Sequence, residues 1–450
     1  MSKASFILIA ALLIPSTALA NGRFPEAQVI ESVPGGDGST VFLRTTFGVL
    51  VSHDTGKHWR WICERALGYE GQWDPPIAVT RDARLWVGLE DGLASTKEGC
   101  EVEKVAELTG ETVKDMTVDT DGSLWAITGQ PGKPSRLWKK PVGKAFESLA
   151  VLGDINAMTL EVAPKKTTRV YVSGQPYDTI RGRIYRSEDG GKTFKDEVVE
   201  MPDGGADAGL ARAADLGHDG PLFIGSVDPD DANRLVVRHL HAHGSEVLLS
   251  KDGGRTFANV LSMKSAMFGF AKSPDGKELW AASGLPEHGI FHSTDRGEHF
   301  EPLVKHGVLC LHAAAPGLLY VCENALTLGA PAIALSRDGG KKIEPLARFA
   351  DVEGPTECGQ PDARASLCAG SWPAMKDLLT FGPDAAVPEL PKWRDTSVPD
   401  AGGGNIIIVP KEKSRCGCEH VGVPVPDHAW FAGLIALAAW VRRRPRGGSR

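Results

Sequence analysis

The chain has 450 residues, of which 42% are hydrophobic and 24% charged, and its formal net charge is −7. This length and this proportion of hydrophobic to charged residues are typical of a folded globular protein. The net negative charge argues against nucleic acid as a partner, because phosphate backbones bind basic surfaces. Eight cysteines are present, and no Cys-x-x-Cys or Cys/His spacing among them suggests a zinc site.

The first twenty residues have the pattern of an export signal. Lys3 is their single charge, residues 6–14 are apolar, and residues 18–20 read Ala-Leu-Ala, which a signal peptidase accepts. We expect residues 1–20 to be a signal peptide and the mature chain to start near Asn21, outside the cytoplasm. An uncleaved membrane anchor is the alternative.

Five short stretches repeat the pattern Ser-x-Asp-x-Gly-x-x-aromatic, with Ile in place of the aromatic residue in the last copy. They start at Ser52, Ser187, Ser250, Ser293 and Ser336, and the last three starts are 43 residues apart. Two degenerate copies, around residues 95–102 and 139–146, raise the count to seven. A turn followed by a short β-rich apolar run precedes each copy, so a second landmark also recurs seven times.

A repeat of this size predicts a small antiparallel sheet of about four strands. Such a sheet cannot bury both of its faces alone, so neighbouring sheets must stack on each other. Radial stacking gives a β-propeller. The sequence therefore predicts an all-β, seven-bladed β-propeller over residues 21–350. We expect the early stretch at residues 28–33 to pair with the last blade and close the ring.

The repeated stretch resembles the Asp-box, or BNR repeat, of sialidases, sortilin-type receptors, xyloglucan-hydrolysing enzymes and photosystem assembly factors. The resemblance implies a sialidase-like or sortilin-like propeller in which the box belongs to the scaffold. Elementary chemistry agrees, because Asp can accept the N–H groups of a hairpin turn, Gly tolerates positive φ, and the aromatic ring can be buried. The residues with this expected structural role are Ser52, Asp54, Gly56, Trp59, Ser187, Asp189, Gly191, Phe194, Ser250, Asp252, Gly254, Phe257, Ser293, Asp295, Gly297, Phe300, Ser336, Asp338 and Gly340.

No catalytic residue can be assigned from the sequence. Sialidases need an arginine triad, an acid/base and a Tyr–Glu nucleophile, but no arginine here has the Arg-Ile-Pro context, and Tyr171, Tyr185 and Tyr320 look like apolar strand residues. We expect a non-catalytic module that binds a protein or polysaccharide through the pore face of the propeller and the long loop at residues 201–220, without a cofactor. The alternatives are an exo-acting glycoside hydrolase of the sialidase-like class, which would need two carboxylates, and an assembly factor.

Three histidines alternate in the stretch RHLHAHGSE. His239, His241 and His243 share one face if the strand continues through them, which is compatible with a metal site. Solvated histidines on a blade rim are the simpler alternative. The nearby acidic stretch, residues 228–231, lacks the spacing of an EF-hand and is expected to form a turn.

Six cysteines lie between the two ends of the chain, an even number typical of disulfides in an oxidising compartment. Nearest-neighbour pairing predicts the bonds Cys63–Cys100, Cys310–Cys322 and Cys358–Cys368. The last bond would pin a small cap over residues 351–381. Residues 382–415 are rich in Pro, Gly and Asp, and we expect them to form a flexible stalk.

The C-terminal residues 416–450 contain Cys-Gly-Cys, a run of thirteen apolar residues and an arginine cluster that starts at Arg442. The run is too short to span a bilayer as a helix, and the arginines would stay on the cytoplasmic side. This order resembles the myxobacterial C-terminal sorting tail (MYXO-CTERM type). The resemblance implies processing near Cys416 or Cys418 and anchoring at the cell surface or outer membrane. A short conventional anchor is the alternative.

Overall fold

The computed structural model describes residues 24–97, 99–196, 210–212, 220–323, 331–359 and 362–380. The chain divides into two units, Met1–Pro399 and Asp400–Arg450, and every described residue belongs to the first. The expected signal peptide, stalk and sorting tail, with Cys416 and Cys418, lie outside the described residues, as does most of the loop 201–220. These assignments stay predictions.

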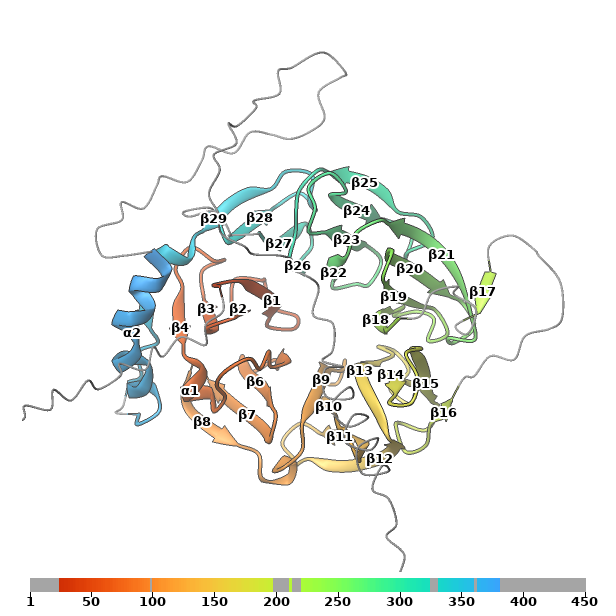
Figure 1. The fold of residues 1–450 in the computed structure, drawn as a ribbon, viewed down its shortest axis with the longest axis horizontal. Coiled ribbons are helices and arrows are strands. Elements are labelled where there is room, and N and C mark those ends of the chain that lie inside the picture. The colour runs from red at the N-terminus through yellow and green to blue at the C-terminus, as the bar shows by residue number, and fades with distance from the viewer. Residues whose placement is uncertain are drawn as a thin grey trace, which may run out of the picture. The chain divides into compact units, whose positions relative to one another are not determined.

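The described residues form seven antiparallel sheets arranged as the blades of a ring, which confirms the predicted seven-bladed, all-β propeller (Figure 1). Blades 1 to 3 are β1 (Ala27–Ser32), β2 (Val41–Thr45), β3 (Gly48–Ser52) and β4 (Arg60–Ile62); β5 (Ile77–Val79), β6 (Arg84–Leu89), β7 (Gly92–Lys97) and β8 (Cys100–Lys104); and β9 (Val113–Val118), β10 (Leu124–Gln130), β11 (Lys133–Lys140) and β12 (Glu147–Gly153). Blade 4 is β13 (Ile155–Val162), β14 (Val170–Pro176), β15 (Arg183–Ser187) and β16 (Lys195–Asp196).

Blade 5 has a fifth strand at its outer edge. It consists of β18 (Leu222–Val227), β19 (Leu235–His241), β20 (Gly244–Ser250) and β21 (Thr256–Met263), with β17 (Leu210–Arg212) paired to β21. Blades 6 and 7 are β22 (Met267–Lys272), β23 (Leu279–Ser283), β24 (Ile290–Ser293) and β25 (Glu301–Val304); and β26 (Cys310–Ala315), β27 (Leu318–Cys322), β28 (Ile333–Ser336) and β29 (Glu344–Ala347).

Each blade is a meander that runs outward from its first, innermost strand (Figure 1). The connections between first and second strands and between third and fourth strands therefore lie on one face of the ring, and the remaining connections lie on the other. The five Ser-x-Asp stretches all begin at the last residue of a third strand. We call the face that carries these turns the turn face and the opposite one the loop face.

The hydrophobic core lies between neighbouring blades rather than within one sheet. Phe42 and Ile62 of blade 1 pack with Ile77 and Leu85 of blade 2 in one buried cluster, and similar clusters join the other blades. The second strands read as nearly continuous apolar runs because both of their faces are covered. The three tyrosines expected to be strand residues, Tyr171, Tyr185 and Tyr320, are buried as expected.

The expected pairing of residues 28–33 with the last blade is wrong. Strand β1 is the innermost strand of blade 1 and pairs with β2. Blade 7 already has four strands of its own from β26 to β29, so it has no vacant position for another. Blades 7 and 1 meet instead through side chains, including a 2.9 Å hydrogen bond from the Tyr320 hydroxyl to the carbonyl oxygen of Gly38.

All six body cysteines form disulfides, but two of the three predicted pairings are wrong. Cys63 bonds to Cys368 and Cys100 to Cys358, with sequence separations of 305 and 258, while Cys310–Cys322 forms as predicted. Nearest neighbours along the chain are not neighbours in space, because the segment after blade 7 returns to blades 1 and 2. Cys310 and Cys322, in contrast, face each other directly on β26 and β27.

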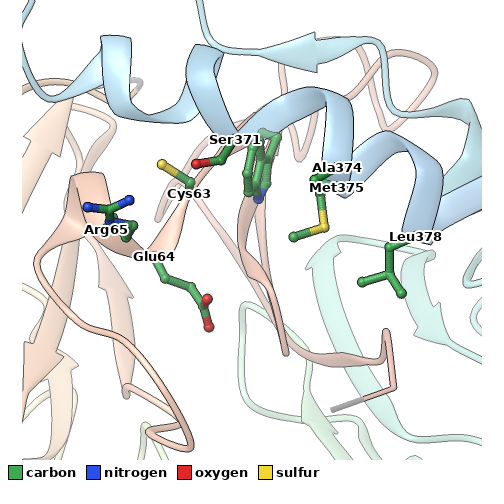
Figure 2. Close-up of a pocket in the computed structure, with 8 residues that line it drawn as sticks. Cys63, Glu64, Arg65, Ser371, Ala374, Met375 and Leu378 are labelled. Atoms are coloured by element: carbon green, nitrogen blue, oxygen red, sulfur yellow. The ribbon is translucent and has the colours of Figure 1, made fainter. Parts of the chain in front are cut away.

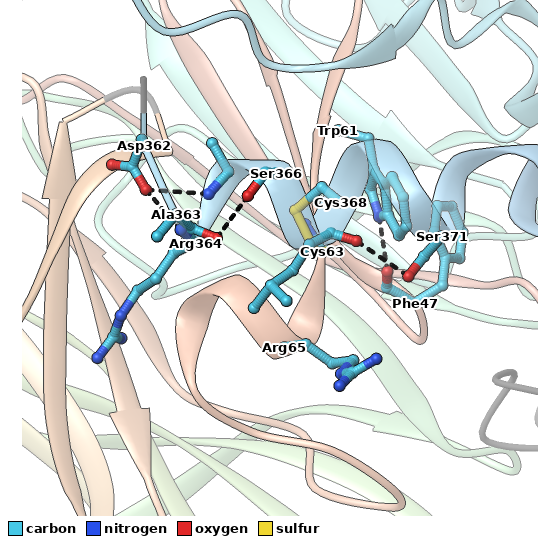
Figure 3. The surroundings of a disulfide bond; sticks show 12 residues. Phe47, Trp61, Cys63, Arg65, Asp362, Ala363, Arg364, Ser366, Cys368 and Ser371 are labelled. Carbon is cyan, nitrogen blue, oxygen red and sulfur yellow. Dashed lines mark hydrogen bonds between the residues drawn. A yellow bond between two sulfur atoms is a disulfide. The ribbon is translucent and has the colours of Figure 1, made fainter. Parts of the chain in front are cut away.

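The expected cap is a helix, α2 (Ala365–Thr380), that lies beside the outer strand of blade 1 (Figures 1 and 3). Strand β30 (Gly354–Pro355) first pairs with β4 in parallel. The ring of Trp372 then packs on Trp61, with centroids 5.6 Å apart, and the Cys63–Cys368 bond joins the helix to the start of the short helix α1 (Glu64–Leu67). The segment after blade 7 is thus tied to blade 1 by a short added strand, a disulfide and ring packing.

A cavity of about 50 Å³ lies between α1, β4 and α2 (Figure 2). Its lining includes Cys63, Glu64, Met375 and Leu378, and its size leaves room for a few water molecules at most. Two 3₁₀ turns, η1 (Ala106–Leu108) and η3 (Phe349–Asp351), complete the regular structure described. Among the described residues, no helix has the length and apolar character needed to cross a membrane.

Candidate functional site

The acidic Ser-x-Asp turns have carboxylates that are already occupied. In blade 5 the Asp252 carboxylate accepts the Ser250 hydroxyl (2.9 Å), the N–H groups of Arg255 (3.0 Å) and Thr256 (2.9 Å), and the Thr256 hydroxyl (2.7 Å). Gly254, at φ +90°, donates its N–H to the Ser250 hydroxyl oxygen (2.8 Å). These donors hold the pKa of Asp252 below its usual value, although partial burial opposes them.

The other four turns repeat these contacts. In each, the Ser hydroxyl donates to the Asp, the Gly N–H donates to the Ser, and the N–H four residues after the Asp donates to the carboxylate, at Asp54, Asp189, Asp295 and Asp338. The rings of Trp59, Phe257 and Phe300 are buried below their turns, and Phe194 is partly buried. With their oxygens committed to the turn, these aspartates have little left to offer a substrate.

A group of charged side chains meets instead around the axis of the ring. Glu31, Asp115, Glu161 and Lys272 come from β1, β9, β13 and β22, the innermost strands of blades 1, 3, 4 and 6. We call these four residues the axial group. The Lys272 Nζ lies 3.1 Å from each carboxylate oxygen of Glu161, and the Asp115 carboxylate accepts the N–H of Leu160 at 2.8 Å.

Two acids of the axial group, Glu31 and Asp115, have raised pKa values. Burial raises the pKa of Glu31 to about 8, with Asp115 and Glu161 adding repulsion and Lys272 opposing the shift. Burial also raises the pKa of Asp115 to about 7, against the bond from Leu160. Glu31 is therefore largely protonated at neutral pH, and a carboxyl that stays neutral at this pH is found as the acid of acid/base sites.

Arg238 of β19 extends the axial group toward blade 5. Its guanidinium carbon lies 5.5 Å from the ring centroid of Phe223 and 5.9 Å from that of Phe270, and burial lowers its pKa to about 10. Sequence reasoning missed the axial group and Arg238, because each charge lies alone in a separate repeat and only the closed ring brings them together. Charged residues inside otherwise apolar inner strands were the available signal.

Exposed apolar side chains gather on the loop face of blades 4 and 6. Tyr177 (41% exposed) and Ile180 (58%) lie in the connection between β14 and β15. Phe268 (52%) lies where the register of β22 shifts against β23, and Leu285 (47%) follows β23. The bulge turns the Phe268 ring outward over Gly284, where an added Cβ would lie 2.9 Å from the ring.

Blade 5 connects these two apolar groups along the loop face. The Gly182 N–H donates to the Gly220 oxygen (3.1 Å), which joins the Ile180 loop to blade 5. On the other side, the Ser245 hydroxyl donates to the Ser265 oxygen (3.0 Å) and accepts the N–H of Met267 (2.9 Å). The loop face of blades 4 to 6 thus forms one surface, which we call the loop-face sector.

The sector also carries polar side chains. The Ser265 hydroxyl lies 2.6 Å from Nδ1 of His288 and 2.7 Å from the Ser283 hydroxyl. At the tip of the β19–β20 hairpin, the structure brings His239 and His241 together with Glu246, which was not foreseen, and leaves His243 outside that group. The stretch at residues 228–231 forms the expected turn, because the Asp228 carboxylate accepts two of its N–H groups.

No family model matches the chain, and no curated protein matches it. Among solved structures, an ancestral GH74 enzyme matches at 12% identity with a TM-score of 0.46, over 67% of this chain and 44% of that one. A GH74 xyloglucanase from Xanthomonas campestris matches at 15% identity (TM-score 0.36, 77% and 66%), and YCF48 bound to D1 peptide at 17% (TM-score 0.38, 58% and 77%). The chain spans less than half of the ancestral GH74 structure. At these values the likeness bears on no activity, ligand or partner of this chain.

Proposed function

We propose that the protein is a non-catalytic binding module that takes a protein partner on its loop-face sector. The observation that carries this proposal is the position of the exposed apolar residues. Tyr177, Ile180, Phe268 and Leu285 all lie on the loop face of blades 4 and 6, on either side of blade 5. Exposed apolar side chains gathered on one face are typical of interaction sites, whose centres favour aromatic residues.

The chemistry of the sector favours a protein over a polysaccharide. Ile180 and Leu285 offer branched aliphatic groups that fill apolar pockets but give no flat face to a sugar ring. None of the large apolar residues exposed in the described part of the chain is a tryptophan, the largest aromatic surface for stacking. Polysaccharide binding is therefore an outcome for the test rather than the proposal.

A second candidate function, exo-acting glycoside hydrolysis, is supported by Glu31, whose raised pKa suits a general acid. This hypothesis is weakened by the other two carboxylates of the axial group, those of Glu161 and Asp115. Glu161 is neutralised by Lys272 at 3.1 Å, and Asp115 holds the Leu160 N–H. A hydrolase needs one of them as a base or nucleophile, so we place the axial group with the scaffold. There Lys272 joins blade 6 to blade 4, and Asp115 joins blade 3 to blade 4.

We further propose that the chain is an exported Asp-box propeller anchored at the cell surface by its sorting tail. Three disulfides support folding in an oxidising compartment. The proposed division is a signal at 1–20, the propeller at 21–350, the cap at 351–381, the stalk at 382–415 and the tail at 416–450. Mass spectrometry of the mature protein tests the tail, and finding Arg450 on it would rule out sorting.

The functional test uses purified residues 21–415 on a glycan array and a panel of fluorogenic glycosides. We expect no turnover and no glycan binding that depends on the sector. Turnover abolished by Glu31→Gln would establish the hydrolase and overturn the proposal. Glycan binding lost in Phe268→Ser/Leu285→Ser but kept in Val142→Ser, an exposed apolar control on the turn face, would replace the protein partner with a polysaccharide.

A further inference from the structure

We infer that His239, His241 and Glu246 form a binding site for a divalent transition-metal ion, with Zn²⁺ as the best fit. The inference concerns a site that the proposed function does not need. Strand alternation places His239 and His241 on the same side of β19, and the register of the hairpin puts Glu246 of β20 directly opposite His239. One donor atom from each residue lies within 4.8 Å of the other two.

The distances suit a small ion. Nδ1 of His239 and Oε2 of Glu246 are 3.1 Å apart. A tetrahedral Zn²⁺ with bonds of about 2.0–2.2 Å keeps its ligand atoms about 3.4 Å apart. The His239–Glu246 pair therefore already has the required spacing. The separations to His241 have to close by at most roughly 1.4 Å, which rotation of one partly exposed side chain at a hairpin tip can supply.

His239 and Glu246 are shielded from water. The side chain of His239 is 2% exposed and that of Glu246 is 16% exposed, so the carboxylate and the imidazole face each other with little water. In the structure they share a hydrogen bond. A bound ion would take the place of the shared proton and neutralise the carboxylate with two imidazole nitrogens as co-ligands.

A second layer of contacts holds the carboxylate in position. Nδ2 of Asn259 donates to the other oxygen of Glu246, Oε1, at 3.0 Å and to the Ser262 hydroxyl at 2.9 Å. This orients Oε2 toward His239, as outer partners do in metal sites. The N–H of His243 donates to Nδ1 of His241 at 3.2 Å, and an ion bound at that nitrogen would replace this one long bond.

The donor set identifies the class of metal. Two imidazole nitrogens and one carboxylate oxygen suit Zn²⁺ and its neighbours in the transition series, whereas Ca²⁺ and Mg²⁺ prefer oxygen ligands alone. Three protein ligands leave one tetrahedral position for water or for a donor atom of a bound partner. The site belongs to blade 5, between the two apolar groups of the loop-face sector.

The test measures metal binding to residues 21–415, made without a polyhistidine tag and stripped with a chelator. Equilibrium dialysis against Zn²⁺ should give one bound ion per chain, and Co²⁺ should give the visible absorption of a four-coordinate site. His241→Ala and Glu246→Gln should weaken binding at least about tenfold. Asn259→Ala, which removes only the outer contact, should weaken it by about 10- to 100-fold.

The matched control is His299→Ala. His299 pairs with Asp295 at 2.7 Å on the exposed turn face but belongs to no group of three possible ligands among the described residues, so its loss should leave zinc binding unchanged. Circular dichroism checks that each variant is folded, and the cobalt spectrum of the unmodified protein tests the site without any variant. Failure to bind either ion, equal binding by Glu246→Gln, or an equal loss in His299→Ala would overturn the inference.

Discussion

Lys272 places its ammonium 3.1 Å from both carboxylate oxygens of Glu161, which joins the innermost strands of blades 6 and 4 although these blades are not neighbours in the ring. Lys272 is 41% exposed and Glu161 is 18% exposed. Both residues act electrostatically on Glu31, whose raised pKa keeps it largely protonated at neutral pH. The axial group is thus a balanced set of charges, in which removing one partner leaves another uncompensated.

We predict that Lys272→Met lowers the free energy of unfolding by about 1–3 kcal/mol, because Glu161 is left partly buried without its counter-charge. The double variant Lys272→Met/Glu161→Gln should recover most of that loss, and chemical denaturation of the four proteins in the cycle measures the coupling. If Lys272→Met and the double variant were equally stable, the Lys272–Glu161 pair would contribute no coupling free energy between the two blades.

Glu31 makes stability depend on pH in a defined direction. Its pKa is raised from 4.5 to about 8, so the folded protein keeps a proton that the unfolded chain releases in that range. Stability should therefore fall as pH rises from about 4.5 to about 8. Glu31→Gln should remove part of this fall and stabilise the protein at pH 8 by on the order of 2 kcal/mol, with little effect near pH 4.

The control for this prediction is Glu301→Gln, an exposed glutamate of β25. It should leave the pH profile of the melting temperature unchanged. Asp115, whose pKa is raised to about 7, contributes in the same direction and will remain in the Glu31→Gln variant. A pH profile identical in wild type and Glu31→Gln would contradict the burial of this carboxyl.

The disulfides predict a specific peptide map. Digestion without reduction should release a peptide pair containing Cys63 and Cys368 and another containing Cys100 and Cys358. Because these two bonds close long loops, removing both with alanines should cost more stability than removing Cys310–Cys322, which closes 12 residues, and each bond should contribute about 2–4 kcal/mol. Recovery of Cys63 with Cys100 would contradict the docking of α2.

Asp252→Ala should destabilise the protein by about 1–3 kcal/mol, because the N–H groups of Arg255 and Thr256 lose their acceptor. The pKa of Asp252 is lowered, so its contribution is present above the ordinary value of 3.8 and declines as pH falls through the lower folded value. Thermal melts against Glu107→Ala, an exposed control, measure the effect. Unchanged melting would mean that the turn does not need its aspartate.

The sequence predicted the features that short, repeated stretches encode, namely the turns and the number of blades. Each Ser-x-Asp stretch carries its own donors, acceptor and glycine, so the position of the turn and the number of blades follow from a few adjacent residues. The disulfide partners of Cys63 and Cys100 depend on where the last segment docks, which no local pattern encodes. Nearest-neighbour pairing therefore failed for both.

Most residues of the axial group and of the loop-face sector could not be predicted, because no local sequence pattern shows which repeats lie close together in the ring. Glu31, Asp115 and Glu161 belong to three different repeats, and only ring geometry brings them within electrostatic reach of one another. Phe268 looks like a buried strand residue until a one-residue shift in β22 turns it outward. The histidines were visible because they alternate along a single strand, whereas Glu246 joins them from the neighbouring strand.

Site-specific photocrosslinking tests whether a protein partner binds the loop-face sector. A photoreactive phenylalanine analogue is placed at Phe268, at Leu285 or, as a control, at Val142 on the turn face, and whole cells of the source organism are irradiated. We predict that the first two positions crosslink to the same protein and that the control does not. Equal crosslinking from all three positions, or none from Phe268 and Leu285, would contradict the account.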